Sequence, residues 1–237
     1  MTPASGALVR LLVANVELGE HERAAAAGAA LAEHRPDLVV LLEWDGANVD
    51  LAPLLDGGLA VVLSDPRPGP YGLAVLARPD SAAAAVLPTP IDGPCPMPWA
   101  TVRWSPAPGR ELGILVAHVP PPIPACGHTT RPSLRALGAI VHDGTLASRL
   151  GDHPIVVGDL NTPARSPRFR RLLADTGSSD AAFAGNTEYT FPSELPLLRL
   201  DHVLVPEGLA VHDAVTLPVP GSDHKAVMVT LSAPLGP

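Results

Sequence analysis

Aromatic residues and cysteines are scarce in this chain of 237 residues. Only 3% of the residues are aromatic, and the two cysteines, Cys95 and Cys126, lie in proline-rich stretches without the CxxC or Cys/His spacing of a zinc site. We therefore predict two free thiols and no zinc centre. The chain also has no GxSxG motif and no recognised motif of a nucleophilic cysteine, so nucleophilic serine or cysteine catalysis is disfavoured.

Long apolar runs are also missing. No segment reaches the roughly 18 consecutive apolar residues of a membrane span. Asn15 and Glu17 interrupt the first apolar stretch, so the amino-terminal region does not follow the pattern of a signal peptide. We predict a cytoplasmic protein with no transmembrane segment. The sequence says nothing about its oligomeric state.

Positive charge is in deficit. There are 16 Lys and Arg residues against 24 Asp and Glu, which gives a formal net charge of -8. Such a chain repels polyanions at long range, so duplex nucleic acid is disfavoured as a partner. The argument does not exclude it, because a bound divalent ion would neutralise some of the carboxylates.

The composition that is present suits one folded α/β unit. Hydrophobic residues make up 46% of the chain, so a core of closely packed Ala, Val and Leu is available. The 29 prolines and 21 glycines stand between apolar runs, where they indicate loops and not disorder. We find no repeat and no linker, and we predict a single domain over residues 1–237.

Short apolar and β-branched runs predict more strands than helices. We expect strands at about 8–17, 38–43, 59–63, 72–78, 100–104, 111–119, 154–159, 200–205 and 226–231, with a hairpin between the fifth and the sixth. Helices are expected at about 21–34, at about 132–150, and from Ser166, where Pro167 follows a good N-cap. This mixture favours a four-layered α/β/β/α sandwich of two mixed sheets flanked by helices. The loops 79–98 and 120–131 are expected to be the most mobile parts.

Polar residues close many of the predicted strands. They are Asn15, Glu43, His118, Asp159, Asn161, Asp201, His202, Asp223 and His224. One polar residue at a strand end is ordinary, whereas this many carboxylate, amide and imidazole groups predict a shared polar pocket at one end of the sheets.

The segments that carry these residues resemble a known family. LLVANVE, PDLVVLLE, YGLAVLAR, AHV, VVGDLNTP, LDHVLV and PGSDH, in this order, resemble the endonuclease/exonuclease/phosphatase superfamily, which includes DNase I, apurinic endonucleases, inositol phosphatases and sphingomyelinases. The resemblance extends over residues 8–231. It implies an enzyme, namely a metal-dependent hydrolase of phosphoester bonds.

The resemblance also implies a metal site. Asn15, Glu43 and Asp223 would hold Mg²⁺, or alternatively Mn²⁺, with Glu43 as the principal carboxylate. These hard oxygen donors suit Mg²⁺, which keeps some of its water and takes a phosphate oxygen as a further ligand. Glu17, two residues beyond Asn15, is either an acid behind this site or a solvated strand end.

By the same resemblance, five further residues would be catalytic. Asp159 would orient or deprotonate the attacking water, and Asn161 would donate to a phosphoryl oxygen. His224, paired with Asp223 or another acid, would contact the phosphate. His118 would lie near the phosphate or the leaving group, and Asp201 would complete the acidic cluster.

Other polar residues are given structural roles. His202 should point away from Asp201 on a regular strand, and Arg78 should support the fold. Arg131 and Arg135 could meet an anionic substrate, although a solvated helix face is the favoured interpretation.

The substrate is the least constrained part. RLDHVLV and PGSDHKAV resemble the bacterial branch that includes the teicoplanin-resistance phosphatases, which act on lipid pyrophosphates and carry membrane helices not found in this sequence. We therefore expect a small-molecule or lipid phosphate or pyrophosphate ester. A DNase-like nuclease is the alternative, and a repurposed non-hydrolytic enzyme or binding protein is a third possibility.

Overall fold

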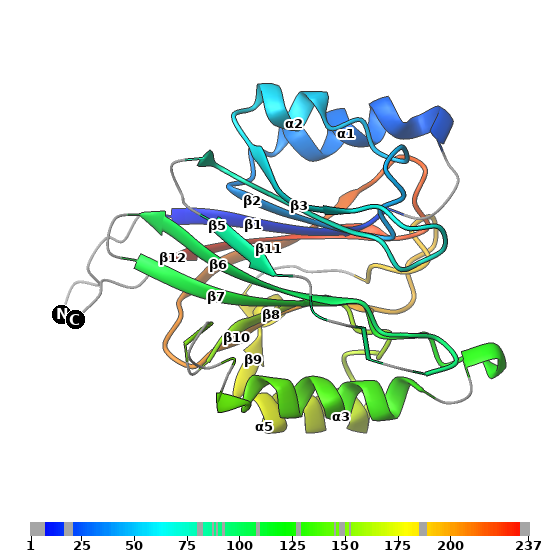
Figure 1. The fold of residues 1–237 in the computed structure, drawn as a ribbon, viewed down its shortest axis with the longest axis vertical. Coiled ribbons are helices and arrows are strands. Elements are labelled where there is room, and N and C mark those ends of the chain that lie inside the picture. Colours follow the sequence, from blue (N-terminus) through cyan, green and yellow to red (C-terminus); the bar gives the residue numbers. More distant parts are fainter. Residues whose placement is uncertain are drawn as a thin grey trace.

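Two six-stranded mixed sheets pack face to face, with helices on their outer faces (Figure 1). The structure is a computed structural model, and it describes residues 8–16, 21–79, 83–86, 88, 90–91, 93–107, 110–126, 129–144, 146, 150–151, 153–184 and 189–232. This arrangement confirms the predicted α/β/β/α sandwich. Glu17 lies outside the described residues.

The first sheet has the strand order β11-β12-β1-β2-β4-β3. At its centre, β1 pairs in parallel with β2 and antiparallel with β12. The bounds of its strands are β1 Leu8–Asn15, β2 Leu38–Leu42, β3 Ala60–Asp65, β4 Leu73–Ala77, β11 Val211–Pro218 and β12 Lys225–Ser232.

The second sheet has the order β5-β6-β7-β8-β10-β9. The predicted hairpin joins β6 to β7, and β7 then pairs in parallel with β8. The bounds of its strands are β5 Ala83–Val86, β6 Trp99–Ala107, β7 Arg110–Ala117, β8 Ile155–Asp159, β9 Ser178–Asp180 and β10 Asp201–Pro206.

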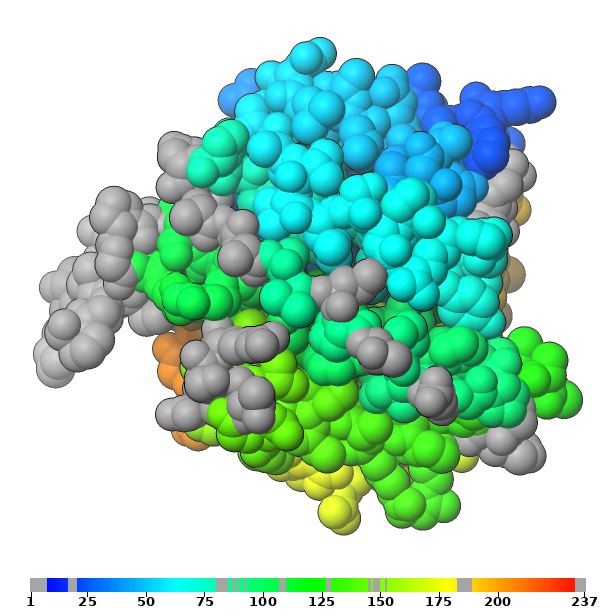
Figure 2. All heavy atoms as spheres, in the orientation of Figure 1, coloured from blue at the N-terminus to red at the C-terminus, as the bar shows by residue number. Residues whose placement is uncertain are grey.

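Helices cover both outer faces. The short η1 (His21–Arg23), α1 (Ala24–Glu33) and α2 (Ala52–Asp56) lie on the first sheet, whereas α3 (Thr130–Val141) and α5 (Pro167–Thr176) lie on the second (Figure 1). The 3-10 turns η3 (Pro124–Cys126) and η4 (Ala181–Ala184) are in connections. In the same orientation, the blue and cyan half of the chain lies directly against the green half (Figure 2).

Sequence signals set the bounds of the second pair of helices. Ser166 caps α5, because its Oγ accepts a hydrogen bond from the Phe169 backbone N–H at 3.1 Å, as predicted. The helix expected over 132–150 is interrupted. α3 begins at Thr130 and ends at Val141, His142 and Asp143 are not helical, and residues 144, 146 and 150 are helical again. Asp143, a poor helix former, lies in the interruption.

The main core fills the space between the sheets. It consists mostly of aliphatic side chains, as the composition predicted, and includes Leu11, Val40, Val75, Ile114 and Val157. Each fully buried aliphatic side chain contributes roughly 1.5–3 kcal/mol. Two further clusters lie under the outer helices. The close packing fixes the strand ends relative to one another.

Three strands, β5, β9 and β11, were missing from the sequence prediction. β5 consists of Ala-Ala-Ala-Val, and alanine has low β-propensity. β9 has only three residues. β11 contains a register irregularity between Val211 and Asp213, which breaks the alternation that identifies a strand.

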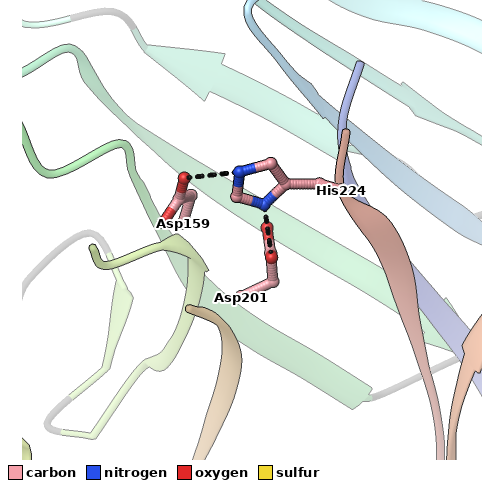
Figure 3. A group of neighbouring side chains, drawn as sticks. All are labelled: Asp159, Asp201 and His224. Carbon is pink, nitrogen blue, oxygen red and sulfur yellow. Dashed lines mark hydrogen bonds and ion pairs between the residues drawn. The ribbon is translucent and has the colours of Figure 1, made fainter. Parts of the chain in front are cut away.

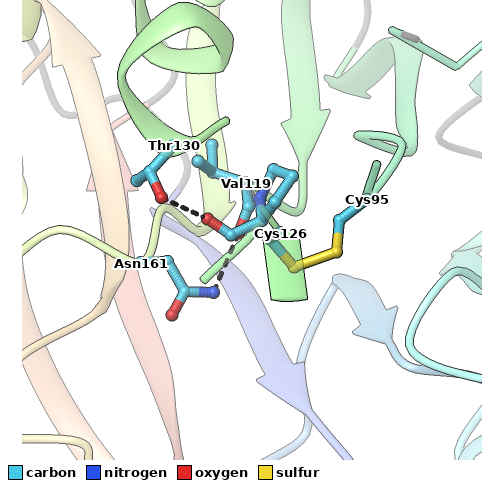
Figure 4. Close-up of a disulfide and its surroundings, with 6 residues drawn as sticks. Cys95, Val119, Cys126, Thr130 and Asn161 are labelled. Carbon is cyan, nitrogen blue, oxygen red and sulfur yellow. Dashed lines mark hydrogen bonds between the residues drawn. A yellow bond between two sulfur atoms is a disulfide. The ribbon is translucent and has the colours of Figure 1, made fainter. Parts of the chain in front are cut away.

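The prediction of free thiols was also wrong. Cys95 and Cys126 form a disulfide with a Cα–Cα distance of 5.0 Å and a sequence separation of 31 (Figure 4). The two cysteines come from the two loops that were expected to be the most mobile. The disulfide therefore ties these loops to each other, and their mobility stays a prediction.

Candidate active site

The predicted site residues gather where several strands end between the two sheets. Asn15 ends β1, Glu43 follows β2, and His118 follows β7. Asp159 ends β8, and Asp201 begins β10 directly opposite it in the antiparallel register. The turn before β12 supplies Asp223 and His224, so both sheets contribute to one cluster.

Asn15 and Glu43 are joined by a hydrogen bond. Asn15 Nδ2 donates to Glu43 Oε1 at 2.9 Å and lies 3.3 Å from Asp159 Oδ2. Glu43 has a φ of 59°, a left-handed conformation that is uncommon for a glutamate. Such backbone strain is tolerated mainly where the surrounding structure requires it, and functional sites are the usual place.

Asp159 lies at the centre of the cluster. Its Oδ2 is 3.7 Å from His118 Nε2 and 3.8 Å from His224 Nε2, and its Oδ1 accepts a hydrogen bond from the Asn161 backbone N–H at 2.8 Å. Gly158 before it approaches the neighbouring strand so closely that a Cβ would lie 1.8 Å from the Ala117 oxygen. Only glycine fits there, which explains the VVGD sequence.

Asn161 lies beyond the end of β8 and has a φ of 44°. Its side chain reaches the cluster nevertheless. Nδ2 donates to the Val119 oxygen at 2.8 Å and lies 3.4 Å from Asp159 Oδ2. Asn161 thus connects the loop after β7, through the bond to Val119 shown in Figure 4, to the central carboxylate of Asp159.

His224 lies between two carboxylates (Figure 3). Its Nδ1 is 2.8 Å from Asp201 Oδ2, and its ring packs against Phe191. Burial opposes the charged ring, but the nearby carboxylates of Asp201, Asp159 and Asp223 outweigh it and raise the pKa of His224 to about 10. The sequence did not show which acid pairs with His224. The structure identifies Asp201, at 2.8 Å from Nδ1, whereas Asp223 Oδ1 is 3.9 Å from Nε2.

His118, the second histidine, also faces the carboxylates of the cluster. Its Nε2 is 3.7 Å from Glu43 Oε1, and its Nδ1 donates to the Pro70 carbonyl oxygen at 2.9 Å. That hydrogen bond places the proton on Nδ1 and directs Nε2 towards the carboxylates.

Asp223 is the most exposed member of the cluster, with 47% of its side chain accessible. Burial nevertheless raises its pKa, and the charge of Glu43 adds to the effect. Ser222 holds the preceding turn, because its Oγ donates to the Asn15 oxygen at 2.7 Å and accepts from the His224 backbone N–H at 2.9 Å.

The carboxylates of the cluster repel one another, and a bound cation would reduce this repulsion. Burial raises the pKa of Asp159, and the charge of Asp201 raises it further. Asp201 Oδ1 is buried and has no hydrogen-bond partner among the described residues. Oxygen donors that repel one another in this way fit a hard divalent ion such as Mg²⁺.

One compact trio within the cluster has the geometry of a metal site. The ligand atoms of Asp159, Asp201 and His224 all lie within 4.8 Å of one another. An imidazole must be neutral to bind a metal, however, and a pKa of about 10 keeps His224 protonated at neutral pH. With His224 protonated and bonded to Asp201, the trio is a hydrogen-bonded acid/base unit.

Sequence reasoning missed three residues that position this cluster. They are Pro70, Thr190, whose Oγ1 accepts the Leu200 backbone N–H at 3.1 Å, and Ser222. Ser222 stands inside the quoted PGSDH segment, so proximity could have suggested it. Pro70 contributes only a backbone oxygen, and nothing in the residue type marks such a role.

The remaining polar residues lie outside the cluster. His202 is buried with its Nε2 3.0 Å from the Thr162 oxygen, and Arg78 pairs with Asp37 at 2.7 Å, so both have structural contacts. Arg131 and Arg135 line a groove between α3 and α5 that contains none of the predicted site residues.

Comparisons with solved structures confirm the fold. An endonuclease/exonuclease/phosphatase family protein from Bacteroides thetaiotaomicron matches with a TM-score of 0.71 at 16% identity, covering 98% of this chain and 100% of that chain. D. rerio TDP2 complexed with single strand DNA product matches with a TM-score of 0.73 at 16% identity, covering 94% and 98%. A mannosyl-6-phosphatase from Bacteroides thetaiotaomicron matches with a TM-score of 0.69 at 15% identity, covering 94% and 99%.

Sequence comparison identifies the family. No curated protein sequence matches this chain significantly. The sequence profile of the Endonuclease/Exonuclease/phosphatase family, in contrast, matches residues 12–224, which include every residue of the cluster. The chain belongs to the endonuclease/exonuclease/phosphatase family.

Proposed function

We propose that this chain is a Mg²⁺-dependent phosphoesterase that hydrolyses a small or lipid-type phosphate or pyrophosphate ester by in-line attack of water. The observation that carries the proposal is the position of Asp159 between Asn15, His118 and His224, with Asp201 behind His224. One carboxylate thus faces two imidazoles, and both residue types can transfer protons in general acid–base catalysis. Membership of a family of nucleases and phosphatases supports the same class of reaction.

Asn15, Glu43 and Asp223 are the residues that we propose to hold Mg²⁺, or Mn²⁺ in its place. Bound there, the ion would supply electrostatic stabilisation of a phosphoryl oxygen. Glu43 would be the principal metal ligand. Asn15 Nδ2 orients its carboxylate by donating a hydrogen bond to Oε1 at 2.9 Å. Asp223 is accessible enough to complete the site when substrate enters.

The other residues bind, orient and move protons. Asp159 orients the attacking water and accepts its proton. His224, kept protonated by Asp201, neutralises charge that grows on the phosphoryl group. Asn161 Nδ2 donates to a phosphoryl oxygen, and His118 lies on the side of the leaving group.

A small or lipid-type ester is favoured over duplex DNA by the net charge of -8. The solved relatives include a mannosyl-6-phosphatase and a TDP2 bound to single strand DNA product, so the fold alone is compatible with either substrate. Within the described residues, no helix is both long and apolar enough to cross a membrane. The cytoplasmic location predicted from the sequence stays a prediction, and the Cys95–Cys126 disulfide, a bond that is rare in cytoplasmic proteins, argues against it.

A substrate panel tests this function. Phosphate release would be measured from phosphomonoesters and an isoprenoid diphosphate, and alcohol release from phosphodiesters, each with Mg²⁺ and with EDTA, beside nicking of plasmid DNA at about 50 and about 200 mM salt. We expect EDTA-sensitive release from a monoester or diphosphate and slow nicking. Fast, salt-sensitive nicking without ester turnover would instead support the nuclease.

The metal assignment is tested by Glu43→Gln, which keeps the size of the side chain and removes its charge. Turnover should be abolished, and Mg²⁺ binding measured by calorimetry should weaken in parallel. Glu33→Gln, at the exposed end of α1, is the matched control and should leave both unchanged. Normal turnover in Glu43→Gln would show that Glu43 is not a metal ligand.

A further inference from the structure

A small cavity lies on the far side of His118 from the carboxylates. It has a volume of about 230 Å³ and opens between the connection from β3 to β4, the loop before β6 and the loop after β7. Apart from His118, its lining is almost entirely apolar. The lining residues are Pro70, Tyr71, Cys95, Pro96, Pro98, Pro120, Pro121, Ile123, Ala125 and Cys126.

His118 belongs to both the cavity and the candidate active site. Its Nε2 faces Glu43 and Asp159 at 3.7 Å each, while its Nδ1 is bonded to Pro70, which is itself part of the cavity wall. A group bound in the cavity would therefore contact the same imidazole that faces the reacting centre. The cavity is next to the chemistry and not on a remote surface.

The cavity walls are fastened to the active site by covalent and hydrogen bonds. The disulfide joins the loop before β6 to the loop after β7. In the second loop, Thr130 Oγ1 donates to the Pro120 oxygen at 2.9 Å, and Asn161 Nδ2 donates to the Val119 oxygen at 2.8 Å (Figure 4). The His118 backbone N–H donates to the Pro98 oxygen at 3.1 Å. The cavity is thus a preformed site.

The chemistry of the lining selects its occupant. Among the described residues that line it there is no Lys, Arg, Asp or Glu, whereas the groove between α3 and α5 is lined by Arg131, Arg135, Arg168 and Arg171. Proline rings and the Tyr71 ring present flat apolar faces, which bind aryl and branched alkyl groups and offer few partners to hydroxyl groups.

We infer that this cavity binds the organic group of the substrate, and that the substrate is the phosphate or diphosphate ester of an apolar alcohol. The inference rests on the proposed phosphoesterase function and adds the class of alcohol to it. The phosphate lies at the carboxylate cluster, and the apolar group lies beyond His118 between Tyr71 and the disulfide. Esters of polyhydroxylated alcohols are selected against, because their hydroxyl groups would lose water without finding hydrogen-bond partners.

A homologous series of monoesters tests the inference. Methyl, propyl, dimethylallyl and phenyl phosphate would be compared with glycerol phosphate, using kcat/KM with Mg²⁺ present. In the wild-type protein, kcat/KM should rise about fourfold for each added methylene until the cavity is full, which corresponds to the transfer of one methylene from water. Glycerol phosphate should be hydrolysed no faster than methyl phosphate.

Ala125→Trp would place a bulky side chain at the mouth of the cavity, where Ala125 is exposed. The selectivity for phenyl over methyl phosphate should then fall at least tenfold. Leu55→Trp on α2, at a position with 43% exposure far from the cavity, is the matched control and should keep the wild-type selectivity. If Ala125→Trp fails to fold by circular dichroism, Ile123→Glu, at 47% exposure on the rim, should lower the same ratio.

The outcomes separate the inference from the function on which it rests. EDTA-sensitive hydrolysis with equal kcat/KM along the series would overturn the inference and leave the proposed function intact. A rising series that Ala125→Trp and Ile123→Glu leave unchanged would place the apolar site elsewhere, and would also overturn it. Absence of EDTA-sensitive release from every ester would overturn the proposed function and the inference together.

Discussion

Two histidines face Asp159, and the protein holds them in different ways. His224 is bonded through Nδ1 to the carboxylate of Asp201 at 2.8 Å, whereas His118 is bonded through Nδ1 to the carbonyl oxygen of Pro70 at 2.9 Å. A carboxylate orients a ring and stabilises its positive charge, whereas a carbonyl orients the ring without contributing a net charge.

The difference teaches how one fold gives two imidazoles separate tasks. His224 is surrounded by carboxylates and carries a lasting positive charge, which suits contact with a phosphoryl oxygen. His118 lies at the border between these carboxylates and an apolar cavity, which suits contact with the organic part of an ester. Each prediction below tests one side of this contrast.

The largest effect on rate is expected at Asp159, which faces both rings. Asp159→Asn keeps the shape of the side chain and removes the charge, so kcat should fall by about a hundredfold or more. His224→Ala should have an effect of similar size. The double variant should lose less than the product of the two, because both groups act in one step. Steady-state kinetics at saturating Mg²⁺ measures all three, and strictly multiplicative losses would assign the residues to separate steps.

A smaller loss is expected from Asp201→Asn, which can keep the hydrogen bond to His224 but removes the charge behind it. We expect kcat to fall by about 10- to 100-fold, the usual effect of losing a carboxylate behind a functional imidazole. The pKa of His224, about 10 in the wild-type protein, should decrease. NMR titration of the histidine ring protons in EDTA measures it, and an unchanged pKa would show that Asp201 is not the cause of the shift.

The contact between His224 and Asp201 also predicts how the free energy of unfolding depends on pH. Because folding raises the pKa of His224 from 6.5 to about 10, its contribution is fully present below pH 6.5 and is lost as the pH rises through 10. The free energy of unfolding in EDTA should therefore decrease between these values. Asp201→Asn should make this decrease smaller, and urea denaturation at several pH values measures both proteins. A wild-type curve that stays level over this range would contradict the raised pKa.

The smallest effect on rate is expected on the His118 side. Cys95→Ser removes the disulfide without adding bulk, and the free energy of unfolding should fall by about 2–4 kcal/mol. Turnover of methyl phosphate should change little, because Asp159 and His224 are held by other contacts. Urea denaturation and kinetics check the two parts. Loss of turnover in a protein that is still folded would show that the disulfide also positions the catalytic groups.

Much of the fold could be predicted because most strands have a recognisable local sequence pattern. The runs that became β1, β2, β4, β7, β8, β10 and β12 are apolar, rich in β-branched residues or leucine, and bounded by turn residues. β5 and β11 could not be found in this way. They are held by pairing with β6 and β12, and their own residues show no clear alternation.

The candidate site followed a similar rule. Asn15, His118, Asp159 and Asp201 could be placed because each closes or opens a recognisable strand. The acid that pairs with His224 could not be predicted, because both Asp201 and Asp223 were candidates. Only the register of β10 against β8 brings Asp201 to the His224 ring. The disulfide was missed for a related reason, since 31 residues separate the cysteines and local spacing carries no information about their contact.

The position of β12 ties activity to a strand that lies far along the chain from β1. This last described strand is not at an edge, because it lies between β11 and β1, and His224 stands directly before it. During synthesis, β1 can pair with β12 only after the segment that contains β12 has been made. A chain interrupted before residue 224 would have both an open sheet and an incomplete reaction centre. Recovery of activity during refolding would therefore report the insertion of this strand, and no partly folded form of the protein should hydrolyse an ester.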